Sequence, residues 1–116
     1  SPDYVVVQDS SLIDVIDVAD GLVPGGIILI NTEKNAEEFN IKKNVEIYTM
    51  NATKIAIDNL GVPIVNTTML GGFAAITNLV TLKSLKDAII KRFPNKLAMK
   101  NVKAIEIAYN TVVDNL

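Results

Sequence analysis

Short apolar runs that alternate with helical segments constrain the fold of this chain more than any other feature. The first two runs are rich in Ile and Val and nearly continuous, as is typical of parallel strands, which are covered on both faces. We therefore predict strands over Tyr4–Gln8, Gly26–Asn31 and Glu46–Met50. Pro24-Gly25-Gly26 precedes the second strand and is predicted to form a turn, since a phosphate-binding loop would follow a strand instead.

Helices are predicted between and after these strands, from apolar residues at helical spacing, polar caps and glycine or proline stops. They cover residues 12–18, a weak helix at 35–39, and then 53–60, 69–78, 85–93 and 96–113. The expected caps of the third, fourth and fifth helices are Asn51-Ala52-Thr53, Asn66-Thr67-Thr68 and Ser84, and Pro63-Ile64-Val65 is expected to be extended.

This alternation predicts an α/β fold with a mainly parallel sheet between two layers of helices, a three-layer α/β/α arrangement with a helical C-terminal third. Three strands are few for such a sheet, so we expect it to be truncated at its N-terminal side. The length of 116 residues suits a single domain, 1–116, and the 49% of apolar residues suffices for a core.

Composition excludes several classes of function. The net charge is −2 and no basic stripe carries interleaved aromatic residues, so neither nucleic acid nor a membrane is an expected partner. The chain has no cysteine and no histidine, which removes thiol chemistry, iron–sulfur ligation and the commonest general base and metal ligand. We therefore expect no catalytic residue and no metal site. The absence of cysteine also fits a reducing or anaerobic cytoplasm, and a cytoplasmic location is expected. The first residues do not resemble a signal peptide, and no apolar run reaches the roughly 18 residues needed to span a bilayer.

Polar side chains gather at or just after the predicted strand ends. Because the carboxyl ends of parallel strands share one edge of a sheet, these residues are candidates for a ligand-binding rim. Each is also explained as a helix cap or, for the two lysines, as solvated surface. The candidate rim consists of Thr32, Lys34, Asn51, Thr53, Lys54, Asn66 and Thr67.

Two glycines interrupt a predicted helix, at a cost in helix propensity of about 2 kcal/mol for the pair relative to alanine. The close approach of another backbone or of a ligand would offset that cost. The apolar residues around them form a face that packs either in the core of this chain or against a partner. The candidate subunit interface consists of Met69, Leu70, Gly71, Gly72 and Phe73.

The stretch from Asn51 to Phe73 carries the most specific pattern, with Asn51-Ala52-Thr53-Lys54-Ile55-Ala56 followed by the run from Leu60 to Phe73. Through it, the chain resembles the gamma subunit of the pyruvate (2-oxoacid):ferredoxin oxidoreductases. Further matches run along the chain: Pro2 to Asp9, Gly21 to Gly26, Asn31-Thr32, Ser84-Leu85, Arg92-Phe93-Pro94, Lys100-Asn101-Val102 and Tyr109.

The enzymes of this family oxidatively decarboxylate a 2-oxoacid and join the acyl group to coenzyme A. They use thiamine diphosphate and iron–sulfur clusters, held largely by the other subunits. The resemblance implies an accessory, structural subunit that binds alpha-, beta- and delta-type subunits, serves ferredoxin through the complex and borders the coenzyme A site. Pyruvate is the expected 2-oxoacid, and the chain alone is expected to hold no cofactor and to be inactive.

The sequence departs from the family pattern in two places. Family members carry a strand and a GxGGQG loop before the first matching residue, and this sequence has neither. In addition, Asn51 stands where an aspartate is expected. We therefore expect the chain to be the C-terminal portion of a gamma-type domain.

Two other functions fit the same residues. A stand-alone module would bind a nucleotide or coenzyme A through the rim lysines and the helix starts. A self-associating structural domain would cover its apolar helix faces and open sheet edge with another copy, giving a homo-oligomer.

Overall fold

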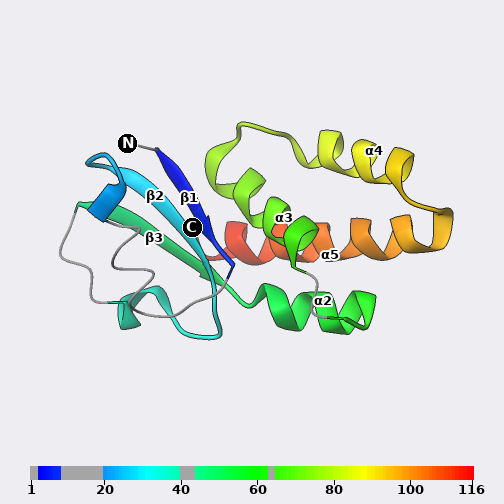
Figure 1. The fold of residues 1–116 in the computed structure, drawn as a ribbon, viewed down its shortest axis with the longest axis horizontal. Coiled ribbons are helices and arrows are strands. Elements are labelled where there is room, and N and C mark those ends of the chain that lie inside the picture. The colour runs from blue at the N-terminus through cyan, green and yellow to red at the C-terminus, as the bar shows by residue number, and fades with distance from the viewer. Residues whose placement is uncertain (1–2, 9–19, 40–43, 63–64) are drawn as a thin grey trace. The chain divides into compact units, whose positions relative to one another are not determined.

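A parallel three-stranded sheet forms the N-terminal part of the chain in a computed structural model, which describes residues 3–8, 20–39, 44–62 and 65–116 (Figure 1). The strands are β1 (Tyr4–Val7), β2 (Gly26–Asn31) and β3 (Val45–Met50), and β2 lies between the other two. Val5 pairs with Ile28, which pairs in turn with Ile47. The three predicted strands and their parallel pairing are confirmed, with ends that differ by at most one residue.

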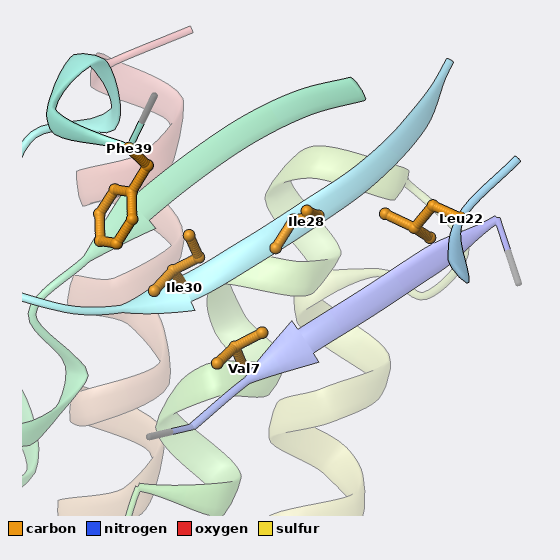
Figure 2. Close-up of a cluster of buried hydrophobic side chains, with 5 residues drawn as sticks. All are labelled: Val7, Leu22, Ile28, Ile30 and Phe39. Carbon is orange, nitrogen blue, oxygen red and sulfur yellow. The ribbon is translucent and has the colours of Figure 1, made fainter. Parts of the chain in front are cut away.

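Apolar side chains from this part of the chain form a core cluster on the sheet (Figure 2). Ile28 and Ile30 are fully buried and, being two residues apart on β2, they point to the same face of the sheet. Val7 of β1 joins them, together with Leu22 and Phe39 from the segments that flank β2. The burial of continuous Ile and Val runs is the main force that holds these strands together.

The turn before β2 depends on glycine. Gly25 has a φ of 81°, a backbone conformation that side chains disfavour, and its N–H donates to the Asn44 carbonyl at 2.7 Å. Gly26 donates to the Val23 carbonyl at 2.9 Å. A Cβ on Gly26 would lie 3.0 Å from that oxygen and 3.2 Å from the carbonyl oxygen of Asp3. The predicted turn is confirmed.

Four helices follow among the described residues: α2 (Ala52–Leu60), α3 (Asn66–Thr77), α4 (Leu82–Arg92) and α5 (Asn95–Asp114). The long α5 packs against each of the other three (Figure 1). Its residues Ala98, Val102 and Ile105 form a buried cluster with Ile89 of α4. The α/β class and the helical C-terminal part are thus confirmed.

The chain divides into two compact units, Ser1–Met50 and Asn51–Leu116, one with the sheet and one with the helices. The single domain over 1–116 and the three-layer arrangement stay predictions. The expected helix at 12–18 and the residues Pro63 and Ile64 lie outside the described residues.

The weak helix expected at 35–39 is a short 3-10 helix, Ala36–Glu38, held at its start by the Asn35 N–H, which donates to the Glu38 carboxylate at 2.7 Å. Three other local predictions, at Val65 and at the starts of α3 and α4, are wrong. Val65 has helical backbone angles instead of extended ones, and it directly precedes α3.

The helices α3 and α4 both begin three residues earlier than predicted. At α3, Asn66, Thr67 and Thr68 are therefore inside the first turn and do not cap it. At α4, the cap is Thr81, whose hydroxyl oxygen accepts from the Ser84 N–H at 3.0 Å. A threonine three residues before Ser84 satisfies the free N–H groups just as a serine cap would, and it brings Leu82 into the helix.

Candidate functional site

Polar groups tie the carboxyl ends of the three strands together within the N-terminal unit. The Asn31 side-chain amide donates to the Gln8 carbonyl, just after β1, at 3.1 Å. The Thr32 N–H donates to the carbonyl of Met50, the last residue of β3, at 3.0 Å. Asn31 and Thr32 are both only 8% exposed. Hydrogen bonds between polar groups therefore hold the carboxyl edge of the sheet together.

Thr32 and Lys34 are the two candidate rim residues in this unit. The Thr32 hydroxyl oxygen accepts from the Lys34 N–H at 3.1 Å, which folds the chain into a tight turn beyond β2. The Lys34 side chain is exposed, and within the described ranges it forms no ion pair. Thr32 thus has a structural role at the sheet edge, while Lys34 remains available to an anionic group.

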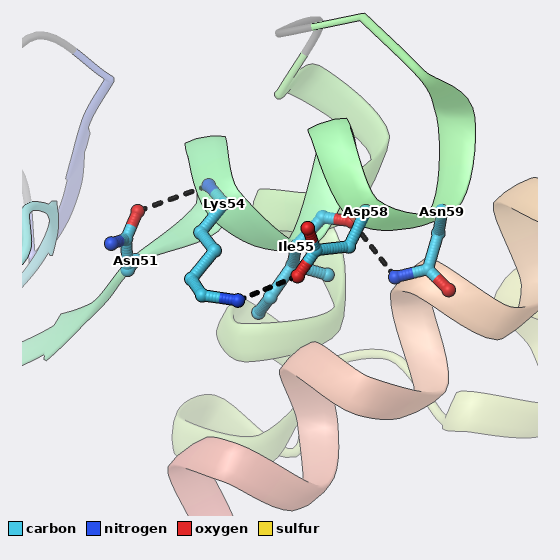
Figure 3. A network of polar contacts seen from close by, with 5 residues as sticks. All are labelled: Asn51, Lys54, Ile55, Asp58 and Asn59. Atoms are coloured by element: carbon cyan, nitrogen blue, oxygen red, sulfur yellow. Dashed lines mark hydrogen bonds and ion pairs between the residues drawn. The ribbon is translucent and has the colours of Figure 1, made fainter.

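The start of α2 holds three further rim candidates in the C-terminal unit, and Figure 3 shows two of them, Asn51 and Lys54. The Asn51 side-chain oxygen accepts from the Lys54 N–H at 3.0 Å and so caps the helix, as predicted. The Lys54 ammonium pairs with Asp58 at 2.7 Å, one helical turn later. Both side chains are more than half exposed, and such pairs contribute only about 0.3–0.5 kcal/mol. Thr53 is half-buried beside them.

The last two rim candidates lie in the first turn of α3. Asn66 is exposed, whereas the Thr67 hydroxyl donates to the side-chain oxygen of Asn101 on α5 at 2.9 Å. Asn101 is 5% exposed, and its amide donates to the Leu97 carbonyl at 3.0 Å. Thr67 therefore locks α3 onto α5. Since the seven rim candidates are divided between the two units, their union into one ligand rim stays a prediction.

The structure explains why one glycine of the pair, Gly71, has no side chain. A Cβ at Gly71 would collide with the Ile105 backbone carbonyl and would lie 3.2 Å from the Ala108 side chain, so α3 approaches α5 closely here. Of the two alternatives, the close approach of another backbone is confirmed for this residue.

The other members of the candidate subunit interface differ in exposure. Met69 and Gly72 are buried, Phe73 is half-buried, and Leu70 is 42% exposed. Of the five residues in the candidate subunit interface, Leu70 is therefore the one that is exposed to solvent. A subunit interface here stays a prediction.

Sequence reasoning missed three polar residues. Asn31 closes the apolar run of β2, Gln8 follows that of β1, and Asn101 interrupts the buried stripe of α5. A polar residue at the end of an apolar run, or alone on an apolar helix face, was the available signal for each.

Among the described residues, no group of three or more Asp or Glu side chains is placed to hold a metal ion. The absence of a catalytic residue stays a prediction. The perturbed titratable group is Tyr48 on β3, whose pKa is raised by burial and by the charge and hydrogen bond of Glu46. Neither residue belongs to the candidate rim.

Comparison with known proteins identifies the family. The family described as pyruvate ferredoxin/flavodoxin oxidoreductase matches residues 1–111. The chain belongs to this family. The resemblance inferred from the sequence pattern is thereby confirmed, and the match extends over both units of the structure.

Relatives within the family are gamma subunits. The chain is 47% identical over 112 residues to the pyruvate synthase subunit PorC of Methanocaldococcus jannaschii, covering 97% of this chain and 61% of that protein. It is 47% identical over 115 residues to the common gamma subunit of the pyruvate/ketoisovalerate oxidoreductases of Thermococcus kodakarensis, covering 97% and 62%. The chain thus spans about three fifths of the length of these relatives.

Solved structures of the family share the fold. The pyruvate oxidoreductase subunit PORC of Thermotoga maritima superposes with a TM-score of 0.84 at 32% identity, over 95% of this chain and 63% of that one. The gamma subunit of a keto/oxoacid ferredoxin oxidoreductase from Geobacter sulfurreducens gives 0.75 at 20% identity, over 97% and 64%, which is a likeness of fold alone.

Proposed function

We propose that the chain acts as a gamma-type component of a 2-oxoacid:ferredoxin oxidoreductase, with pyruvate as the 2-oxoacid, and supports its oxidative decarboxylation to an acyl-coenzyme A. The observation that carries this proposal is the 47% identity to PorC over 97% of the chain. The role is structural, because the chain lacks the side chains that the chemistry needs.

The redox and carbanion chemistry belongs to other subunits in this proposal. Iron–sulfur clusters are held by cysteine thiolates, and the chain has no cysteine. Thiamine diphosphate is bound with a divalent cation, and the described residues place no group of acidic side chains for one. Because the chain has no cysteine and its described residues place no acidic group for the cation, this proposal assigns both cofactors to the alpha-, beta- and delta-type partners. Ferredoxin is served through the same partners.

The assembly takes place in the cytoplasm in this proposal. Within the part of the chain that the structure describes, no helix combines the length and the hydropathy that crossing a membrane requires. The longest of these helices, α5, is amphipathic and is buried along one face against its three neighbours.

Co-purification tests the assembly. The chain, carrying an affinity tag, is co-expressed with alpha-, beta- and delta-type subunits. The proposal predicts one complex of fixed stoichiometry that elutes ahead of any single subunit. A chain that elutes alone, while the other subunits are folded and associated with one another, would contradict it.

A border with coenzyme A is the second element of the proposal. Lys34 is exposed and forms no ion pair within the described ranges, so its ammonium is available to a phosphate of coenzyme A. Calorimetry with coenzyme A on the complex, compared with a Lys34→Glu variant, tests it. We expect the Lys34→Glu variant to bind coenzyme A with a dissociation constant about tenfold higher. Lys83→Glu is the charge-matched control. Equal dissociation constants for the unchanged protein and both variants would show that Lys34 does not contact coenzyme A.

A further inference from the structure

A groove between α3 and α4 shares Thr67 with the candidate rim and Leu70 with the candidate subunit interface, and its other lining residues belong to neither set. It has a volume of about 440 Å³, within the usual range of ligand pockets, and both of its walls belong to the C-terminal unit. Thr67, whose hydroxyl is engaged by Asn101, lies at its polar side. Its apolar lining consists of Leu70, Leu85, Ala88, Ile89 and Phe93.

One cation lines this apolar groove. Arg92 is the last residue of α4, is exposed, and forms no ion pair within the described ranges. Lys91 precedes it, and Lys96 follows in the first turn of α5. No acidic residue lines the groove. The negative end of the α4 dipole explains cations in its last turn, but not the apolar groove beside them.

The surrounding segment is basic in a chain that is acidic overall. Between residues 82 and 106 there are seven Lys or Arg against two Asp or Glu, whereas the whole chain has a net charge of −2. Among the described residues, Lys86 is the one cation of the seven with an ion pair, to Glu106 at 2.5 Å. The other six are exposed and lack an anionic partner in these ranges.

We propose that this groove docks an acidic segment of a partner protein, with a large apolar side chain seated between Leu70 and Ala88 and a neighbouring carboxylate on Arg92. The charge of the groove selects an acidic partner, since burying Arg92 against a neutral or basic segment would leave its charge uncompensated. The apolar lining selects a protein over nucleic acid, because phosphates offer nothing to fill it. This assignment does not depend on the oxidoreductase complex.

Nuclear magnetic resonance titration of the full chain tests the proposal with two synthetic peptides. Each has a Leu-Phe centre; one is flanked by Glu and Asp, and the other by Lys. We expect the acidic peptide to bind with a dissociation constant on the order of 1 mM or below and to shift the backbone amides of Leu70, Ala88 and Phe93. No shifts, or equal shifts with the two peptides, would overturn the proposal.

Matched variants separate docking from general electrostatics. Arg92→Glu is expected to weaken binding of the acidic peptide by about tenfold or more, whereas Lys83→Glu, the same charge reversal at the other end of α4, leaves it nearly unchanged. Leu70→Ala weakens it, and Leu79→Ala, at a more exposed leucine, does not. If Arg92→Glu and Lys83→Glu weaken binding of the acidic peptide equally, the peptide is attracted by the general basic charge of the surface and not by the groove. That result would contradict the proposal.

Two competing occupants give distinct results. If a single-stranded oligonucleotide binds, and both Arg92→Glu and Leu70→Ala weaken its binding, the ligand of the groove is a nucleic acid and not a protein. Self-association in sedimentation that Arg92→Glu abolishes would show that a second copy fills the groove. Either result would overturn the proposal.

Discussion

The backbone carbonyl of Ile105 on α5 occupies the space that a side chain at Gly71 of α3 would need. The hydrogen bond from Thr67 to Asn101, one turn earlier on both helices, holds the same pair of helices together. The helical unit is thus organised around one close helix–helix contact, and the absence of a side chain at Gly71 permits it.

Gly71→Ala is expected to destabilise the chain, although alanine improves helix propensity by about 1 kcal/mol. The added Cβ meets backbone, which cannot rotate away, and overpacking of this kind costs about 1–3 kcal/mol. Urea unfolding measures the change. Gly21→Ala is the control, because a Cβ there meets nothing within 4 Å; an equal effect at both positions would contradict the close contact.

Thr81→Ala is expected to lower the free energy of unfolding by about 0.5–2 kcal/mol, because it removes the cap of α4. Ser84→Ala keeps the cap and loses only an exposed hydroxyl that accepts from Thr81 at 2.8 Å. Its effect should stay within about 0.5 kcal/mol. Thermal unfolding of the two variants shows which residue caps α4. A larger loss of stability in Ser84→Ala than in Thr81→Ala would show that Ser84 is the cap, as the sequence predicted.

Thr68→Val is expected to stabilise the chain by about 1 kcal/mol. The Thr68 side chain is fully buried and its hydroxyl has no hydrogen-bond partner, a desolvation cost that an isosteric methyl removes. Thr111→Val is the control, since that hydroxyl donates to the Ile107 carbonyl at 2.7 Å. Denaturant unfolding compares them, and a destabilised Thr68→Val would show that the hydroxyl is engaged.

Tyr48 is expected to ionise above its ordinary pKa of 10.0, because burial disfavours the phenolate and Glu46 repels it. The folded chain therefore holds the neutral phenol, and this contribution to stability is complete below pH 10 and falls as the pH rises toward the higher pKa. Glu46→Gln should lower the pKa of Tyr48. Ultraviolet absorbance of tyrosinate, with Tyr48→Phe as the reference, measures it; an unchanged pKa in Glu46→Gln would contradict the pairing.

The strands were predictable because their signal is local. The runs that became β2 and β3 are buried or half-buried at nearly every position, with exposed Glu46 as the exception, and their apolar character alone predicts parallel strands. The ends of α2 were likewise predictable from neighbouring residues. Asn51 caps its start, and the glycine that follows the predicted helix, Gly61, ends it with a positive φ of 79°.

The start of α3 was not predictable from local sequence. Thr67 reads as a cap, but its hydroxyl is engaged by Asn101, 34 residues later, and the helix extends past it. Gly71 shows the same limit, because the residue that needs the space belongs to α5. The candidate rim combines residues of both units, so no pattern along the sequence establishes that they meet.

The central claim, a gamma-type role in a 2-oxoacid:ferredoxin oxidoreductase, is tested most directly by activity of the assembled complex. Alpha-, beta- and delta-type subunits are purified with and without this chain, and reduction of a viologen dye is followed with pyruvate and coenzyme A. We predict that omission of the chain lowers the rate by at least about tenfold and that adding it back restores the rate. Full activity without the chain would contradict the account.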